Sequence, residues 1–160
     1  MSFDTSYAWR ERLALRTVKE IMSTDCVTLT LQDNVYEAAL KMKQHNIGFI
    51  PVLDGRKLVG VVTDRDLVVR GYAEKHSGST AIQEVLSEQL TTVNPETSVD
   101  DAAKLMANEQ IRRLPVVEDG NLVGVVAIGD MAVRTKFEDE AGEALSKISE
   151  SNKSFTGAAK

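Results

Sequence analysis

Thr63 and Asp66 bring a hydroxyl and a carboxylate group to the start of a predicted helix. The segment from 60 to 66 reads Gly-Val-Val-Thr-Asp-Arg-Asp, and the two residues stand where an apolar strand gives way to that helix. Backbone N–H groups at a helix start attract anions, and a carboxylate can accept hydrogen bonds from two neighbouring ribose hydroxyls. The same spacing is also that of a capping box, in which both side chains serve the helix alone. Ligand contact and helix capping can coexist.

A second segment, from 124 to 130, repeats this pattern with one change. It reads Gly-Val-Val-Ala-Ile-Gly-Asp, so the acid is kept as Asp130 while Ala127 stands where the first segment has a hydroxyl. The change removes a helix cap and a hydroxyl that could contact phosphate. We therefore expect the second segment to bind a ligand more weakly or through other groups.

Both segments lie within an internal repeat that covers most of the chain. Residues 18–70 align with residues 82–134 without a gap, and the identities fall in blocks. The clearest blocks are the Pro-Val pair at 51–52 and 115–116 and the Leu-Val-Gly-Val-Val run at 58–62 and 122–126. Self-similarity of this kind indicates two copies of one structural unit.

Each copy is predicted to form a strand, a helix, two strands and a second helix, in that order. Val35, Ala38, Ala39 and Met42 have the spacing of an amphipathic helix, which the second copy repeats, with N-caps at 33–34 and 97–98. Strands are expected at 28–29, 49–53 and 57–62 and at 92–93, 113–117 and 121–126, and the closing helices at 63–71 and 127–136.

The repeat sets the expected domain layout. A helical lead-in over 1–17, with a helix at 7–16, precedes the first repeat at 18–72. A polar linker at 73–81 leads to the second repeat at 82–137, and 138–160 holds a closing helix at 138–150 followed by a tail.

The composition is that of a globular protein without a recognisable catalytic or metal-binding motif. The net charge is -5, and no apolar run approaches the roughly 20 residues that cross a bilayer. The chain start lacks the features of a signal peptide and the single Cys26 fits a reducing compartment, so we expect a cytoplasmic protein. His45 and His76 lack partners at metal-ligand spacing, and no nucleophile stands beside a base. We expect no enzyme activity, no metal requirement, and no binding to nucleic acid or membrane.

The ordered set of motifs resembles the cystathionine-β-synthase-type (CBS) domain, and the tandem resembles a Bateman module. The motifs are the opening from Thr92 to Ala102, the Pro-Val segments, and the Gly-apolar-apolar-Thr-x-x-Asp segment. The resemblance implies an α/β (α+β) fold in which two βαββα CBS repeats pack through their sheets with pseudo-twofold symmetry. It also implies ligand clefts between the repeats, and association into a homodimer.

The resemblance further implies a regulatory module that binds an adenine nucleotide (AMP, ADP or ATP) or a related adenosyl compound. Arg113 stands where nucleotide-binding members of the family often pair an arginine with phosphate, although two adjacent arginines are also typical of a solvated strand edge. The ligand-binding residues implied in this way are Thr28, Ile50, Pro51, Thr63, Arg65, Asp66, Thr92, Arg113, Leu114, Pro115 and Asp130. The alternative is a pair of repeats with vestigial sites that serves in dimerisation or docks on an unidentified regulated protein.

Overall fold

The computed structural model describes residues 16–133, 144 and 146–148, and these fall into two compact units. The repeat-1 unit consists of Asp25–Thr91 and Val117–Leu122. The repeat-2 unit consists of the remaining described residues. Each unit has a core of buried apolar side chains of its own.

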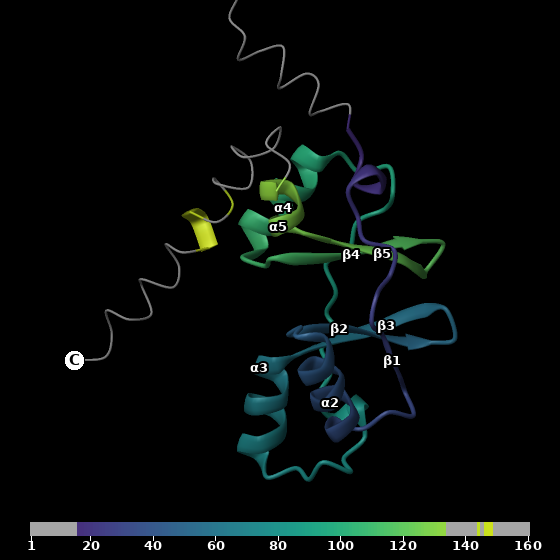
Figure 1. Ribbon diagram of the computed structural model, residues 1–160, viewed down its shortest axis with the longest axis vertical. Coiled ribbons are helices and arrows are strands. Elements are labelled where there is room, and N and C mark those ends of the chain that lie inside the picture. The colour runs from purple at the N-terminus through teal and green to yellow at the C-terminus, as the bar shows by residue number, and fades with distance from the viewer. Residues whose placement is uncertain (1–15, 134–143, 145, 149–160) are drawn as a thin grey trace, which may run out of the picture. The chain divides into compact units, whose positions relative to one another are not determined.

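Three strands form the sheet of the repeat-1 unit (Figure 1). β1 (Leu29–Thr30) pairs in parallel with β2 (Phe49–Asp54), and β2 pairs antiparallel with β3 (Lys57–Thr63). In this register Leu29 lies opposite Val52, and Val52 lies opposite Gly60. Because β3 runs against the other two strands, the starts of β1 and β2 lie at the same edge of the sheet as the end of β3. We call this end of the sheet, where Leu29 and Phe49 begin their strands and Thr63 ends β3, the repeat-1 edge.

The helix α2 (Val35–His45) connects β1 to β2 and places Ala38 and Met42 in the core, whereas Ala39 of the predicted apolar stripe is exposed. Asn34 begins the helix with a capping box, because its Oδ1 accepts from Glu37 N at 2.9 Å while Glu37 Oε2 accepts from Asn34 N at 2.9 Å. Ala38 and Met42, one turn apart, are buried against the sheet. Met42 is therefore a core residue, as the helical spacing predicts.

The chain turns directly from β3 into a helical segment with three different geometries. α3 (Asp64–Asp66) is followed without a break by the π-helical turn η2 (Leu67–Gly71) and by the 3-10 turn η3 (Tyr72–Glu74). A helix was expected over 63–71, and the wider π turn is the part that the sequence pattern does not indicate.

The repeat-2 unit is built in the same way. β4 (Arg113–Glu118) and β5 (Asn121–Ala127) are hydrogen-bonded neighbours, and a parallel bridge between Val93 and Val116 stands in the place of β1. We call the edge at the start of β4 and the end of β5 the repeat-2 edge. The hairpin tip Val117–Leu122 is counted with the repeat-1 unit, where Asn121 pairs with Lys57.

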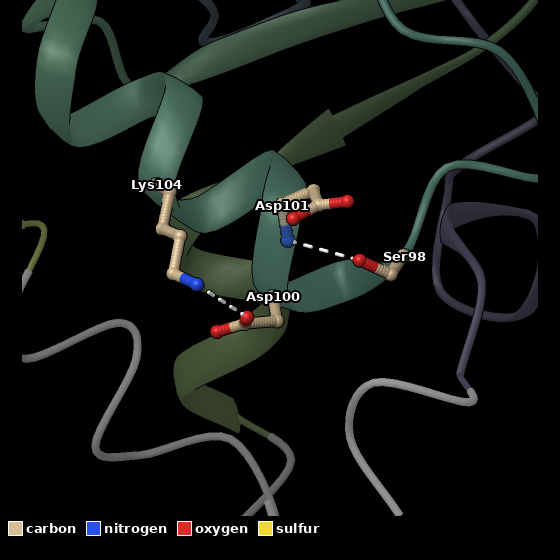
Figure 2. A network of polar contacts seen from close by, with 4 residues as sticks. All are labelled: Ser98, Asp100, Asp101 and Lys104. Carbon is tan, nitrogen blue, oxygen red and sulfur yellow. Dashed lines mark hydrogen bonds and ion pairs between the residues drawn. The ribbon is translucent and has the colours of Figure 1, made fainter. Parts of the chain in front are cut away.

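Two helices accompany β4 and β5, namely α4 (Val99–Glu109) and α5 (Ile128–Val133). The start of α4 is fixed by Ser98, whose Oγ accepts a hydrogen bond from Asp101 N at 3.0 Å (Figure 2). One turn of the helix is also bridged on its exposed side by Lys104 Nζ and Asp100 Oδ2, 2.9 Å apart (Figure 2). These contacts confirm the helix start predicted at 97–98.

The two repeats exchange their leading segments. Val18 and Ile21 open the first repeat in the sequence, with the 3-10 turn η1 (Val18–Glu20), yet they are buried in the core of the repeat-2 unit. The 3-10 turn η4 (Ile82–Glu84) opens the second repeat, yet Ile82 lies in the core of the repeat-1 unit. Each compact unit therefore combines the opening of one sequence repeat with the body of the other.

The predicted elements are confirmed with small shifts of their ends. The strand expected at 28–29 lies at Leu29–Thr30, and the one expected at 92–93 is reduced to the single bridge of Val93. Of the closing helix expected at 138–150, the described residues 144 and 146–148 are helical, and Ala144 and Ile148 join the repeat-2 core. The helix expected at 7–16 lies outside the described residues, apart from its last one.

Candidate functional site

The predicted ligand-binding residues of the first repeat gather at the repeat-1 edge. Thr28 directly precedes β1, Ile50 and Pro51 lie at the start of β2, and Thr63 ends β3 opposite Phe49. Residues 64–66 then carry the chain into α3 at the same edge. The parallel pairing of β1 with β2 produces this convergence, because it brings two strand starts together.

Thr63 and Asp66 cap each other's backbone. Thr63 Oγ1 accepts from Asp66 N at 3.1 Å, and Asp66 Oδ2 accepts from Thr63 N at 2.9 Å. Both side chains are half-buried. The capping role considered for this pair is therefore realised. The other carboxylate oxygen of Asp66, Oδ1, has no hydrogen-bond partner among the described residues, so an acceptor remains for a ligand.

Two further groups at the repeat-1 edge were missed by the sequence reasoning. Lys41 on α2 donates from Nζ to the carbonyl oxygen of Thr28 at 2.7 Å. The carboxylate of Asp64 covers the backbone of Gly48, because a Cβ placed on Gly48 would lie 2.8 Å from Asp64 Oδ2. A signal for the second contact is present in the sequence, since Gly48 stands where the other repeat has Arg112.

The equivalent residues of the second repeat gather at the repeat-2 edge. Thr92 precedes Val93, whose N–H donates to the carbonyl oxygen of Pro115 at 3.1 Å. Arg113 begins β4 and is exposed. At the other strand, Asp130 Oδ2 accepts from Ala127 N at 3.0 Å, so half of the capping box persists without the hydroxyl.

One backbone hydrogen bond recurs at the two edges. The N–H of Asp64 donates to the carbonyl oxygen of Gly48 at 3.0 Å, and the N–H of Ile128 donates to that of Arg112 at 2.9 Å. The first bond joins the residue after β3 to the residue before β2, and the second joins the residue after β5 to the residue before β4. The two edges thus share this backbone hydrogen bond and differ in the side chains around it.

Four of the predicted contact residues are buried. The side chains of Ile50 and Leu114 are fully buried in the cores of their units, and Pro51 and Pro115 are buried beside them. A ligand at either edge would meet mainly the backbone of these residues, because their side chains are buried. Thr28, Thr63, Asp66 and Asp130 are half-buried, and Arg65, Thr92 and Arg113 are exposed.

The part of the chain that the structure describes holds neither a candidate metal centre nor a candidate membrane span. In these residues no group of three or more His, Cys, Asp or Glu side chains is placed to hold a metal ion. None of the described helices combines the length and the apolar character that a bilayer crossing requires.

The chain belongs to the CBS domain family, whose pattern matches residues 18–71 and 82–134. It is similar to the CBS domain-containing protein YhcV of Bacillus subtilis, with 46% identity over 138 residues that cover 86% of this chain and 99% of YhcV. Both matched segments correspond to the two repeats read from the sequence, so the predicted family is confirmed.

Solved structures of CBS proteins share this fold. A putative acetoin utilization protein (AcuB) from Vibrio cholerae is 27% identical and matches with a TM-score of 0.71, over 81% of this chain and 96% of that one. The CBS domain pair of protein MJ0100, solved with 5′-methylthioadenosine and S-adenosyl-L-methionine, is 29% identical with a TM-score of 0.66, over 74% and 94% of the two chains. The mixed α and β fold of tandem CBS repeats is confirmed.

Proposed function

We propose that this chain is a cytoplasmic regulatory module that binds an adenine nucleotide (AMP, ADP or ATP) or a related adenosyl compound at the edges of its CBS repeats, and that it has no catalytic role of its own. The observation that carries the proposal is the recurrence of one carboxylate. Asp66 and Asp130 occupy the same place in the two units, and each uses a single oxygen, Oδ2, to hold the backbone at the end of a strand.

A carboxylate held in this way is suited to a ribose. Its second oxygen faces no competing donor among the described residues, and a charged acceptor binds neutral hydroxyls more strongly than a neutral one does. The capping bond supports this role, because it fixes the carboxylate before a ligand arrives. Capping and ligand contact are thus compatible uses of the same side chain.

The ligand class is suggested by a related structure. The CBS domain pair of MJ0100 was solved with two adenosyl compounds, 5′-methylthioadenosine and S-adenosyl-L-methionine. We extend the shared part of those ligands, the adenosine, to this chain. Bound ligand would shift the arrangement of the module only by as much as it prefers one arrangement over another.

A thermal shift panel tests the proposal first. AMP, ADP, ATP, S-adenosyl-L-methionine and 5′-methylthioadenosine are added separately to the full chain. A ligand present at 100 times its dissociation constant stabilises the native state by about 2.7 kcal/mol, so the melting temperature rises by several degrees. A melting temperature that stays constant with all five compounds would contradict the proposal.

Calorimetric binding to three variants then locates the contacts. Asp66→Ala, Asp130→Ala and Arg113→Ala are compared with the parent, and urea midpoints are recorded for each. Loss of a carboxylate that holds two ribose hydroxyls is expected to cost roughly 1.5–3 kcal/mol of binding, which is about ten- to hundred-fold in affinity. Arg113→Ala should weaken ATP more than adenosine.

Ser98→Ala provides the matched control, because Ser98 caps α4 and has no place in the proposed site. It should lower the free energy of unfolding by about 1 kcal/mol and leave ligand affinity unchanged. If the three site variants behave like this control, the carboxylates are caps alone.

The second candidate function is self-association or docking, and one observation favours it. Tyr36, Val68 and Tyr72 of the repeat-1 unit are 60%, 60% and 84% exposed, although they are large and apolar. A chain that pairs through such residues would form a homodimer. Light scattering should then give a dimer mass at micromolar concentration, and a monomer mass at high micromolar concentration would contradict it.

A further inference from the structure

The two edges present different charges on the same backbone frame. The hydrogen bonds from Asp64 N to Gly48 O and from Ile128 N to Arg112 O are 3.0 and 2.9 Å long. The backbone is therefore held in the same way at this point of both edges. The side chains around this hydrogen bond differ in charge between the edges.

At the repeat-1 edge both signs of charge are present, and a carboxylate lies against the backbone at the start of β2. Asp64 lies over Gly48, where a Cβ would come within 2.8 Å of Oδ2 and 3.0 Å of Cγ. The positive charges near this edge are those of Lys41, bound to Thr28 O, and Arg65, and the carboxylates are those of Asp64 and Asp66. Neither Asp64 nor Arg65 belongs to an ion pair among the described residues. Asp64 is exposed, and its charge faces any anion that approaches the start of β2.

At the repeat-2 edge positive charge prevails. Arg112 and Arg113 replace Gly48 and Phe49 at the start of the strand, and both are exposed. Among the described residues neither guanidinium forms an ion pair. The residue that corresponds to Asp64 is Ile128, which is buried and carries no charge. Asp130, whose Oδ2 accepts from Ala127 N at 3.0 Å, supplies a carboxylate at this edge, against the two guanidinium charges.

The different charges of the two edges favour different adenosyl ligands, according to whether the ligand carries a phosphate group. A guanidinium donates two parallel hydrogen bonds to phosphate oxygens, whereas a carboxylate at the same place repels them. We infer that the repeat-2 edge binds the phosphate-bearing form of the ligand and that the repeat-1 edge binds an adenosyl compound without a phosphate. This inference rests on the proposed adenosyl function, and it assigns a different ligand class to each repeat.

The test compares AMP with 5′-methylthioadenosine, which has the same adenosine and no phosphate. Both are titrated calorimetrically into the full chain at low salt. The parent should bind AMP at one strong and one weak site. Asp64→Asn keeps the oxygen that accepts from Arg65 N at 2.9 Å and removes only the charge, so it should raise AMP affinity at the weak site about 3- to 10-fold.

Arg113→Gln is the reciprocal variant at the other edge. It should lower AMP affinity at the strong site about 3- to 10-fold. Both variants should bind 5′-methylthioadenosine within about two-fold of the parent, because no phosphate is involved. Glu84→Gln is the control, since Glu84 is an exposed acid of the repeat-1 unit that belongs to neither edge. It should leave both affinities unchanged.

The outcomes distinguish this inference from the proposed function. If the parent binds AMP equally at two sites, or if neither variant changes AMP affinity relative to 5′-methylthioadenosine, the charge assignment is wrong while the adenosyl function stands. If the parent binds neither compound, both are wrong. Selectivity that weakens as KCl is raised from low to high concentration supports the electrostatic origin, and selectivity that is independent of salt counts against it.

Discussion

The carbonyl oxygen of Ser23 lies 2.9 Å from the point where a Cβ on Gly124 would stand. Ser23 reaches this position from the opening of the first repeat, and it exchanges two backbone hydrogen bonds with Val125, at 2.9 and 3.0 Å. The first repeat has the equivalent arrangement, in which Ser87 pairs with Val61 beside Gly60. The glycine in each Leu-Val-Gly-Val-Val run therefore admits the exchanged segment against the strand.

Gly124→Ala should lower the free energy of unfolding by about 1–3 kcal/mol, because the added methyl group overlaps a backbone atom that is held by hydrogen bonds. The control is Gly129→Ala in α5, where a Cβ meets nothing within 4 Å. That change should be neutral or stabilising by up to about 1 kcal/mol, since alanine favours a helix interior over glycine. Urea midpoints measure both. Equal midpoints for the two variants would show that the close approach has no energetic consequence.

The exchange of leading segments predicts that Ile82, which opens the second repeat in the sequence, stabilises the repeat-1 unit. Ile82→Ala should destabilise the chain by about 2–5 kcal/mol, because Ile82 is fully buried in the repeat-1 core and its loss leaves a cavity there. Gln83→Ala, at the exposed neighbour in the same 3-10 turn, should stay within about 0.5 kcal/mol. Hydrogen exchange would show reduced protection in β2 and β3 of the Ile82 variant. Reduced protection confined to β4 and β5 would contradict the packing.

The strands, helices and caps were predictable because their signals are local. Asn34 and Ser98 cap helices through hydrogen bonds to residues three positions away, and the helix apolar stripe repeats within a few residues. The repeat reinforced each assignment, since every element was seen twice. The fold family followed from the order of these elements.

The exchange of leading segments was not predictable from the same information. Val18 and Ile82 are equivalent in the alignment and both are apolar, so either one suits the core of either unit. The alignment therefore cannot tell which unit a segment joins. At the site, Asp64 was missed because its contact with Gly48 joins residues that are distant in the sequence, whereas the Thr63 and Asp66 pair lies within one turn.

Acid should lower the free energy of unfolding of the repeat-1 unit, because it protonates the carboxylate of Asp33. Burial alone would raise the pKa of Asp33, but the hydrogen bond from Thr30 N at 2.7 Å, the side-chain contact with Glu37 and the positive charge of Lys41 together outweigh it, so the pKa lies below its ordinary value. A pKa that is lower in the folded chain means that the ionised carboxylate stabilises the fold at neutral pH. This stabilisation is lost as the pH falls below about 4 and through the folded pKa.

Asp33→Asn should therefore differ most from the parent above about pH 5 and converge with it in strong acid. Urea midpoints recorded from neutral pH down to about pH 2.5 give the comparison. A difference between the two proteins that is the same at every pH would show that the charge of Asp33 has no part in stability.

Thr63→Ala gives the repeat-1 edge the residue that the second repeat carries at Ala127. The change removes the hydroxyl that accepts from Asp66 N at 3.1 Å and keeps the bond from Thr63 N to Asp66 Oδ2, as at Asp130. The expected loss is about 1 kcal/mol in the free energy of unfolding, because one helix N–H loses its acceptor. Thr63→Ser keeps that acceptor and should stay within about 0.5 kcal/mol of the parent.

The reverse change, Ala127→Thr, completes the capping box at the repeat-2 edge. The half-buried Ala127 ends β5, and its N–H already donates to Asp130 Oδ2, so a hydroxyl at this place could accept from Asp130 N as Thr63 accepts from Asp66 N. Ala127→Thr should raise the free energy of unfolding by about 0.5–1 kcal/mol, as measured from urea midpoints. In the double variant with Thr63→Ala, the two changes in free energy of unfolding should add. If Ala127→Thr destabilises the chain while Thr63→Ala is neutral, the two edges do not share the capping geometry inferred from their matching hydrogen bonds.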